Sequence, residues 1–510
     1  MTDVRTLTNG APPFPTRPSS VCRFTEGFTI HGSMGDVCPP GAPLGFEGMG
    51  SMSEAWRVCI NTQTPLLQYL DPGLARTVGR DDRPLDLGSY HEGTDYRVSP
   101  GGVTRMVLPL VRRLGEMGAI RDPHWVSLNA KGPKSVRYDG LVLHNVEMSR
   151  LRMAGYGTIK EAVWRVAHGT RTTKGPDEML WTADFSEFAY YNRATAELLR
   201  RLDEANDFDV YYVHDFQQLP VGSMLSRAKP KIFRWHIPFE KGMIPPDWRA
   251  TFEEYLRHYD MVIMSTDRYL RALRDFGYKG PAKRMFPYVD PKDYTFPSPK
   301  EAQAVCAKWG IHPKDQVILA VGRMDPMKGQ DVAIQAFATL ASSFPRAKLL
   351  LVGNGSFSSS RAGLALTKGE AWRAGLEQMI KDLGLQGRVV LTGHVTQLEL
   401  DALYERSLFT VLPSHREGFG LVVVESWLHR RATVVSDRAG ITELLHPGKN
   451  GLVFDPTKVS SLAQDLHLLL DDPGELRHRL AEEGYRTASP CLLDAAAGEE
   501  VAMIREVVGP

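Results

Sequence analysis

Two glutamates eight positions apart, Glu417 and Glu425, frame the part of this sequence best suited to chemistry. The apolar run 408–412 before them predicts a buried strand, and 421–430 predicts a helix. The turn that joins strand to helix contains Gly418, Phe419, Gly420 and Leu421. Such a turn presents free backbone N–H groups and the positive end of a helix dipole, which favours a bound phosphate.

The spacing of the two carboxylates limits what they can bind together. Eight helical residues span about 12 Å, which is too far for both groups to hold one small ligand. The spacing suits the two hydroxyl-bearing ends of a long ligand with phosphate between them, such as a sugar–diphosphate–nucleoside. The alternative is an ordinary capped helix that carries a surface acid at each position.

A second strand–turn–helix unit lies about ninety residues upstream. The apolar run 317–321 leads into Gly322 and Arg323, then a proline-containing turn, then Lys328, and a helix is predicted over 331–340. Arginine offers a planar fork and lysine a mobile point charge, so the two can converge on one anion. The alternative is two solvated basic side chains on a loop.

Candidate residues in the first half of the chain follow predicted strands. Polar side chains at the carboxyl ends of parallel strands point into a cleft, where they can hold sugar hydroxyls. A paired glycine between strand and helix lets a phosphate approach the backbone, although it also fits a plain tight turn. The histidines also fit a packed, hydrogen-bonded structural role. The candidates are Gly101, Gly102, His214, Asp215, Gln217 and His236.

The elements that carry these residues predict an α/β protein with two doubly wound, parallel, Rossmann-like sheets facing a central cleft. Strand and helix patterns alternate from position 89 onward, and the proline-dense segment 281–300 is the predicted linker. The predicted divisions are an extension with loops over 1–88, a first domain over 89–290, a second over 291–485, and a C-terminal helix near the junction over 486–510.

Composition excludes several classes of protein. The 510 residues are 43% hydrophobic and 24% charged, with 61 basic and 60 acidic side chains, so neither nucleic acid nor an anionic membrane is expected as a partner. The five cysteines have no metal-binding spacing and are expected to be reduced thiols. The N-terminal sequence lacks the apolar core of a signal peptide, and we expect a cytoplasmic protein.

The paired-glutamate stretch resembles the motif of retaining GT-B glycosyltransferases of the large glycosyltransferase family 4, particularly the glycosyltransferring trehalose synthases. The Gly-Arg and Lys-Gly segments resemble the same family. The resemblance implies that Glu417 contacts the donor sugar, that Glu425 binds the ribose hydroxyls, and that Arg323 and Lys328 neutralise the leaving diphosphate. The backbone after Glu417 would contact the sugar and its phosphates.

The sequences around His214 and His236 resemble both trehalose synthases and trehalose-6-phosphate synthases. The resemblance places Asp215 and His236 against the donor sugar in the first domain, which would also bind the acceptor. It implies transfer of glucose from UDP-, ADP- or GDP-glucose to glucose, giving trehalose. No tightly bound cofactor and no essential metal are expected.

Other functions remain open from the sequence. The acceptor could be a sugar phosphate or a polyol, and a homodimer is possible. A nucleotide-sugar epimerase or hydrolase on the same scaffold would act without an acceptor. A binding protein with an inactive site is a third possibility, which the intact Arg323, Lys328, Glu417 and Glu425 disfavour.

Overall fold

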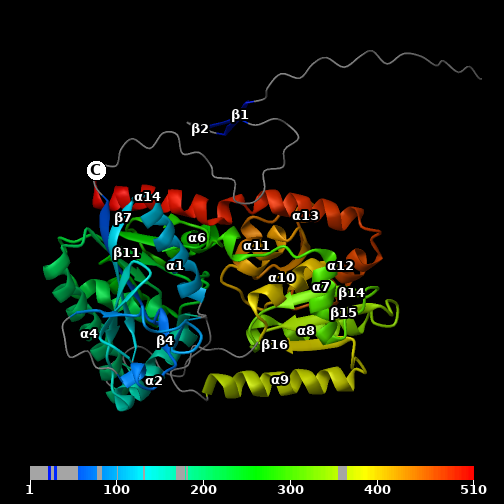
Figure 1. Ribbon diagram of the computed structural model, residues 1–510, viewed down its shortest axis with the longest axis horizontal. Helices are drawn as coiled ribbons and strands as arrows, with labels where there is room; N and C mark the ends of the chain where they lie inside the picture. The colour runs from blue at the N-terminus through cyan, green and yellow to red at the C-terminus, as the bar shows by residue number, and fades with distance from the viewer. Residues whose placement is uncertain are drawn as a thin grey trace, which may run out of the picture. The chain divides into compact units, whose positions relative to one another are not determined.

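The computed structural model describes residues 21–24, 28–31, 55–76, 83–99, 102–129, 132–167, 178–179, 182–353 and 364–509, with 21–24, 28–31 and 364–368 described by backbone alone. The chain divides into two compact units, Met1–Gly48 and Met49–Pro510. In the first, β1 (Val21–Phe24) pairs antiparallel with β2 (Phe28–His31). The second unit contains two large sheets, coloured from blue to green and from green to orange in Figure 1.

The first large sheet has the order β13-β12-β11-β10-β3-β7-β9-β8-β5 in the described chain. Its strands are β3 (Trp56–Thr62), β5 (Leu85–Asp86), β7 (Ile120–Leu128), β8 (Ser135–Tyr138), β9 (Leu141–Val146), β10 (Val210–His214), β11 (Lys231–Arg234), β12 (Met261–Met264) and β13 (Ala282–Arg284). All neighbours pair in parallel except β8 and β9. The order of strands reverses between β3 and β10, and ligands of such sheets bind at that point.

The prediction that 1–88 is an extension with loops is wrong for two of its segments. β3 is an interior strand of the first sheet, flanked by β10 and β7, and β5 is an edge strand of the same sheet. Both faces of an interior parallel strand are covered, so the side chains of Val58, Cys59 and Ile60 are buried. No helix directly follows β3; the small antiparallel pair of β4 (Leu67–Tyr69) and β6 (Tyr96–Val98) comes first, which hides the βα pattern.

Helices cover both faces of the first sheet. They are η1 (Leu74–Arg76), α1 (Gly102–Glu116), α2 (Arg150–Ala167), α4 (Ala183–Asn206), η2 (Phe216–Met224), α5 (Pro246–Leu256), α6 (Asp267–Phe276) and, from the C-terminus, α14 (Leu493–Val508). One core contains apolar residues of α2, α4, α5 and α6. The other contains those of α1 and α14.

The second sheet has the order β16-β15-β14-β17-β18-β19, with every neighbouring pair parallel. Its strands are β14 (Gln316–Val321), β15 (Ala347–Val352), β16 (Val389–Gly393), β17 (Phe409–Leu412), β18 (Ala432–Ser436) and β19 (Leu452–Phe454). This is the 3-2-1-4-5-6 order of a dinucleotide-binding sheet, so its ligand crevice lies between β14 and β17. Both strong sequence motifs follow these two strands.

The helices of this half have the following bounds: α7 (Pro299–Cys306), η4 (Ala307–Trp309), η5 (Pro326–Lys328), α8 (Gln330–Ala338), α9 (Leu364–Asp382), α10 (Gln397–Arg406), α11 (Leu421–Leu428), η6 (Gly440–Glu443), α12 (Val459–Asp471), α13 (Glu475–Thr487) and η7 (Ser489–Cys491). Most begin after a strand of the sheet, as expected of a doubly wound unit. Their apolar faces bury the sheet in a core of Val, Leu, Ile and Phe side chains.

The predicted linker 281–300 is partly ordered into other elements. Ala282–Arg284 is the edge strand β13, and η3 (Pro291–Asp293) and the start of α7 lie in the same segment. The connection between the two sheets is therefore shorter, covering 285–298. Beside it, Val289 exchanges backbone hydrogen bonds with Cys491 and Leu493, so the C-terminal segment pairs with this connection before α14 returns to the first sheet.

Candidate active site

The turns after β14 and β17 are held against each other at the crevice of the second sheet. The side chain of Asp325 accepts a hydrogen bond from the backbone N–H of Met327 and so caps η5. The carbonyl of Met327 accepts the N–H of His415 at 2.9 Å. Gly329 has φ +65°, and a Cβ there would lie 2.0 Å from the carbonyl oxygen of Pro413, so no side chain fits.

This packing brings the predicted basic residues together with the first glutamate. Lys328 forms an ion pair and a hydrogen bond with Glu417, whose carboxylate also accepts the Ser414 hydroxyl at 3.3 Å. Burial would raise the pKa of Glu417, but the charges of Lys328 and Arg323 and the two hydrogen bonds outweigh it and hold that pKa below its usual value. The site therefore places two cations near one ionised carboxylate, and Lys328 is paired with it directly. A narrow pocket beside them is lined by Gly322, Lys328, Gln330, Leu412, Pro413 and Ser414.

The glycine turn after Glu417 opens α11 as predicted. Gly420 has φ +106° and caps the helix, a conformation that favours glycine, and a Cβ there would also lie 2.8 Å from Leu412. Phe419 is buried with its ring 5.7 Å from that of Phe286. The first backbone N–H groups of α11, from Leu421 onward, thus come four residues after Glu417.

Glu425 lies on the second turn of α11 and is half-buried. One carboxylate oxygen accepts the hydroxyl of Tyr404 at 2.9 Å, and the other accepts that of Tyr294 at 3.3 Å. Sequence reasoning missed both tyrosines. Neither follows a strand or forms part of a recognisable motif, so only the fold reveals the contact.

In the first sheet, Asp215 stands at the end of β10 in a strained conformation. Its φ of 70° and ψ of 162° lie in a region that costs a non-glycine residue about 1–3 kcal/mol. Burial raises the pKa of its carboxyl to about 7, although the backbone N–H groups of Phe216 and His236 oppose the rise. Within the described residues, Asp215 Oδ1 and Gln217 Oε1 are buried and have no hydrogen-bond partner. Each therefore lacks the hydrogen bond that a buried polar atom normally makes.

The two strand-end histidines form a pair. His214 Nδ1 and His236 Nε2 are 3.0 Å apart, and the rings stack with centroids 5.3 Å apart. Burial lowers the pKa of both histidines well below the usual value, and the nearby charge of Arg234 lowers it further. A neutral pair donates one proton between its rings and keeps the remaining nitrogens for other partners.

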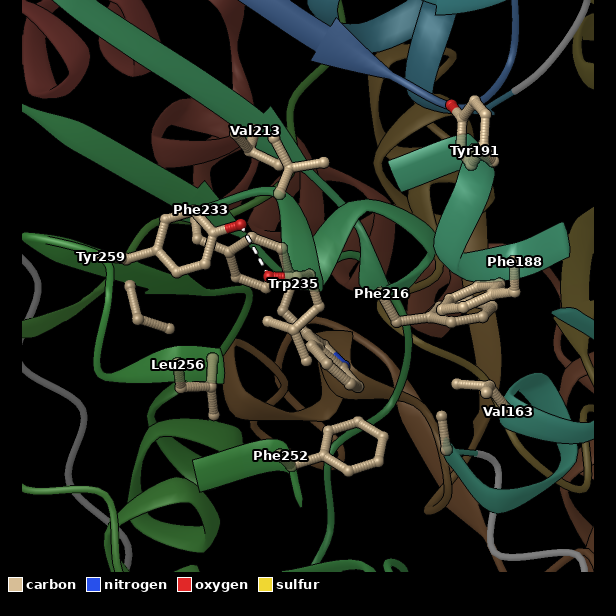
Figure 2. Close-up of a cluster of buried hydrophobic side chains, with 14 of the residues drawn as sticks. Val163, Phe188, Tyr191, Val213, Phe216, Phe233, Trp235, Phe252, Leu256 and Tyr259 are labelled. Atoms are coloured by element: carbon tan, nitrogen blue, oxygen red, sulfur yellow. Dashed lines mark hydrogen bonds between the residues drawn. The ribbon is translucent and has the colours of Figure 1, made fainter. Parts of the chain in front are cut away.

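Neighbouring aromatic residues anchor these polar groups. Figure 2 shows Phe216 and Trp235, which adjoin Asp215 and His236 in sequence, directed into the buried cluster under the sheet. Their ring centroids are 6.4 Å apart, and Trp235 packs at 5.3 Å against Phe239. The packing of these two rings fixes the backbone next to Asp215 and His236.

Contacts between the two halves of the second unit bring the loop after β11 close to the turn after β17. The first contains His236 and is called the histidine loop; the second covers 417–420 and is called the glutamate turn. A Cβ at Gly418 would lie 3.1 Å from the carbonyl oxygen of His236. The hydroxyl of Tyr269, on α6, donates to the carbonyl of Glu417 at 3.1 Å. Gly102 begins α1, and a Cβ there would meet no atom within 4 Å. Gly101 lies outside the described residues.

A separate cavity of about 40 Å³ lies among α2, α4, η2 and α5. Its walls are almost entirely apolar, with Val163, Phe188, Phe216 and Phe252 among them (Figure 2). A sugar needs many polar partners and more space, so this cavity is not the substrate site.

Comparison with known proteins agrees with this geometry. Residues 303–487 match the family Glycosyl transferases group 1, and residues 174–271 match Trehalose synthase, N-terminal domain. The group 1 match spans all six strands of the second sheet. The first match includes Arg323, Lys328, Glu417 and Glu425, and the second includes Asp215.

Two curated relatives extend the comparison. Alpha-D-kanosaminyltransferase of Streptomyces kanamyceticus is 30% identical over 193 residues, which cover 38% of this chain and 46% of the relative. Mannosylfructose-phosphate synthase of Agrobacterium fabrum is 28% identical over 301 residues, covering 54% of this chain and 64% of the relative. The chain thus spans less than two thirds of the length of either relative.

The solved structure of trehalose-6-phosphate from E. coli bound with UDP-2-fluoro glucose has a TM-score of 0.66 at 17% identity. The alignment covers 88% of this chain and 99% of that chain. At this identity the likeness establishes the fold, and the predicted GT-B architecture is confirmed. In the described part of this GT-B chain, no three or more His, Cys, Asp or Glu side chains gather as a metal site, and no helix has the length and apolarity to cross a membrane.

Proposed function

We propose that this protein is a retaining glycosyltransferase that moves glucose from a nucleoside diphosphate glucose to a small sugar, with glucose as acceptor and trehalose as product. The observation that carries the proposal is the cluster of Arg323, Lys328 and Glu417 at the crevice between β14 and β17. Two cations there suit a diphosphate leaving group, and the carboxylate suits the hydroxyls of the sugar attached to it.

In the proposed reaction, the bond between the anomeric carbon and the diphosphate oxygen breaks while the acceptor oxygen bonds to the same face of that carbon. The acceptor proton passes to the leaving phosphate oxygen, so no protein nucleophile is needed. Arg323 and Lys328 stabilise the negative charge that develops on the diphosphate. The N-terminus of α11 faces the same group through the backbone of 418–421.

The first sheet supplies the groups that orient the transferred sugar. Asp215, when ionised, would stabilise positive charge at the anomeric carbon, because its Oδ1 is buried and unpaired within the described residues. His236 would hold a sugar hydroxyl, with His214 fixing its ring from behind. Gln217 offers a further unpaired oxygen for sugar or acceptor.

The proposed donor is supported by the E. coli neighbour, which binds UDP-2-fluoro glucose. In this chain the backbone around Gly102 and Gly322 would face the phosphates, and Glu425 would bind the ribose. The base remains a choice among uracil, adenine and guanine, since the proposed contacts involve only phosphate, ribose and sugar.

The proposed acceptor rests on the trehalose synthase N-terminal match, which covers the strand ends that carry His214 and His236. A sugar phosphate acceptor is the alternative, favoured by the relative named mannosylfructose-phosphate synthase. The deciding experiment incubates UDP-, ADP- and GDP-glucose with glucose, glucose 6-phosphate and fructose 6-phosphate and identifies the products by mass spectrometry and by the linkage seen in proton NMR. Trehalose from unphosphorylated glucose supports the proposal, and a product formed only from a phosphorylated acceptor rejects the acceptor assignment.

An epimerase or hydrolase would need no acceptor. Incubation with the nucleotide sugar alone distinguishes these activities, because a transferase leaves the donor largely intact. Rapid conversion of the donor sugar without acceptor would contradict the proposed transfer reaction.

A further inference from the structure

Both oxygens of the Glu425 carboxylate are already engaged by tyrosine hydroxyls. Tyr404 donates to Oε2 at 2.9 Å and Tyr294 to Oε1 at 3.3 Å. Two donors on two different oxygens fix the carboxylate against rotation, which a single contact would not do. A surface acid on a helix would normally have neither.

Tyr404 is itself immobilised. Its side chain is fully buried, and its ring stacks on His429 with centroids 4.9 Å apart and planes 10° apart. Its carbonyl accepts Arg431 Nε at 2.9 Å. His429 in turn has Nδ1 at 2.9 Å from Glu405. The hydroxyl of Tyr404 therefore points at Glu425 from a rigid support.

Tyr294 belongs to the connection between the two sheets and is held by the same cluster. The next residue, Thr295, donates both its backbone N–H and its hydroxyl to Asp401, at 2.8 and 2.9 Å. Asp401 also lies 3.4 Å from His429 Nε2. Burial would lower the pKa of His429, but Asp401 and Glu405 outweigh it and raise that pKa. The cluster of Asp401, Glu405 and His429 thus holds Tyr404 in place directly and Tyr294 through Thr295.

An ionised carboxylate has about four lone-pair positions, of which the tyrosines take two. One position remains on each oxygen, so the group can accept two further hydroxyls side by side. A vicinal diol presents its two donors in that arrangement, whereas a 2′-deoxyribose lacks one of them.

We propose that Tyr404 and Tyr294 are positioning residues that aim Glu425 at the vicinal diol of a ribonucleoside, and that they give the site its preference for ribose over 2′-deoxyribose. This inference rests on the proposed function, in which Glu425 binds the ribose of the donor. The preference for ribose over 2′-deoxyribose would thus depend on two side chains that do not contact the nucleotide.

The test compares binding of a ribonucleoside diphosphate with that of its 2′-deoxy counterpart by calorimetry, using whichever of UDP, ADP and GDP binds the wild-type protein most tightly. The wild type should prefer the ribo form by at least about tenfold, because each hydrogen bond to a charged group is worth roughly that much. Tyr404→Phe should reduce the preference to about threefold or less, mainly by weakening the ribo form. Tyr294→Phe should act in the same direction but less strongly, because its contact is longer.

A purely structural role for Tyr404 predicts a different result. A general loosening would weaken both nucleotides equally and leave their ratio unchanged, and that outcome overturns the inference. Tyr278→Phe is the matched control, because it also removes the hydroxyl of a buried tyrosine, one that donates to Pro281 in the first half. It should leave the ratio at the wild-type value.

Glu425→Gln distinguishes a failure of the positioning role of the tyrosines from a failure of the ribose assignment of Glu425. If Glu425→Gln abolishes the preference and Tyr404→Phe does not, the ribose assignment stands and the positioning role is wrong. If Glu425→Gln retains the full preference, or if no nucleoside diphosphate binds, the ribose assignment itself fails. In steady-state kinetics, Tyr404→Phe should raise the donor KM while kcat stays near the wild-type value.

Discussion

Gly418 and His236 meet where the glutamate turn of one sheet approaches the histidine loop of the other. A Cβ at Gly418 would lie 3.1 Å from the carbonyl oxygen of His236, tighter than most such contacts. The hydrogen bond from the Tyr269 hydroxyl to the carbonyl of Glu417 is a second contact between the same two halves. The absence of a side chain at 418 thus lets the turn after Glu417 approach His236 closely.

Gly418→Val is expected to lower kcat by at least about tenfold, because the added methyl groups force the turn away from His236 and a small misplacement of catalytic groups is costly. The measurement is steady-state turnover with saturating donor and acceptor. Gly375→Val, in α9, is the matched control, since a Cβ at 375 meets no atom within 4 Å. Unchanged turnover in Gly418→Val would mean that this approach is not needed for catalysis.

Arg323→Ala and Lys328→Ala are each expected to reduce kcat by about a hundredfold or more, because loss of a preorganised charge at the leaving group costs roughly 3 kcal/mol. Turnover at saturating donor is the measurement. Lys300→Ala, an exposed position on α7, serves as control. Near-normal turnover in either variant would show that its charge does not face the leaving diphosphate.

The activity should depend on pH through Asp215, whose pKa is raised to about 7. If the ionised carboxylate stabilises the transition state, kcat/KM for the donor rises as pH increases through about 7 and then levels off. Asp215→Asn should remove this limb and leave a low, flat profile. A limb that persists in Asp215→Asn would assign the titration to another group.

The raised pKa of Asp215 also makes the stability of the folded protein depend on pH. A carboxyl with a raised folded-state pKa favours the folded protein while it is protonated, and this contribution is lost as pH rises from the unfolded pKa of about 4 through about 7. Asp215→Asn should therefore unfold at a higher temperature than wild type at pH 8, with a smaller difference at pH 4. Thermal unfolding of both proteins at the two pH values gives the comparison, and an equal difference at both would contradict the buried, raised pKa.

The product should keep the α configuration of the donor, because the proposed attack occurs on the face from which the diphosphate leaves. Proton NMR of the product gives the anomeric coupling directly. EDTA should leave most of the activity, since Arg323 and Lys328 carry the leaving-group charge in this scheme. A β-linked product would refute retention, and activity lost in EDTA and restored by Mg²⁺ or Mn²⁺ would show that the two cations are insufficient.

Sequence alone determined the local units that carry the site. The strand, glycine turn and helix around Glu417, and the strand and turn around Arg323, could be predicted because their geometry depends on neighbouring residues: the apolar run, Gly420 and the Pro326 turn. The same patterns predicted the two doubly wound sheets. β3 was missed because no helix directly follows it in the chain, and its place in the sheet depends on pairing with β10 and β7.

Only the tertiary structure decided which of these groups meet. Lys328 and Glu417 are 89 residues apart, and Tyr294 and Glu425 are 131 apart, so no local pattern specifies either contact. The raised pKa of Asp215 and the lowered pKa of His214 likewise depend on burial within the fold, which a linear sequence does not display. Long-range packing sets distances and solvent exposure, and these convert a set of suitable residue types into a site of defined charge.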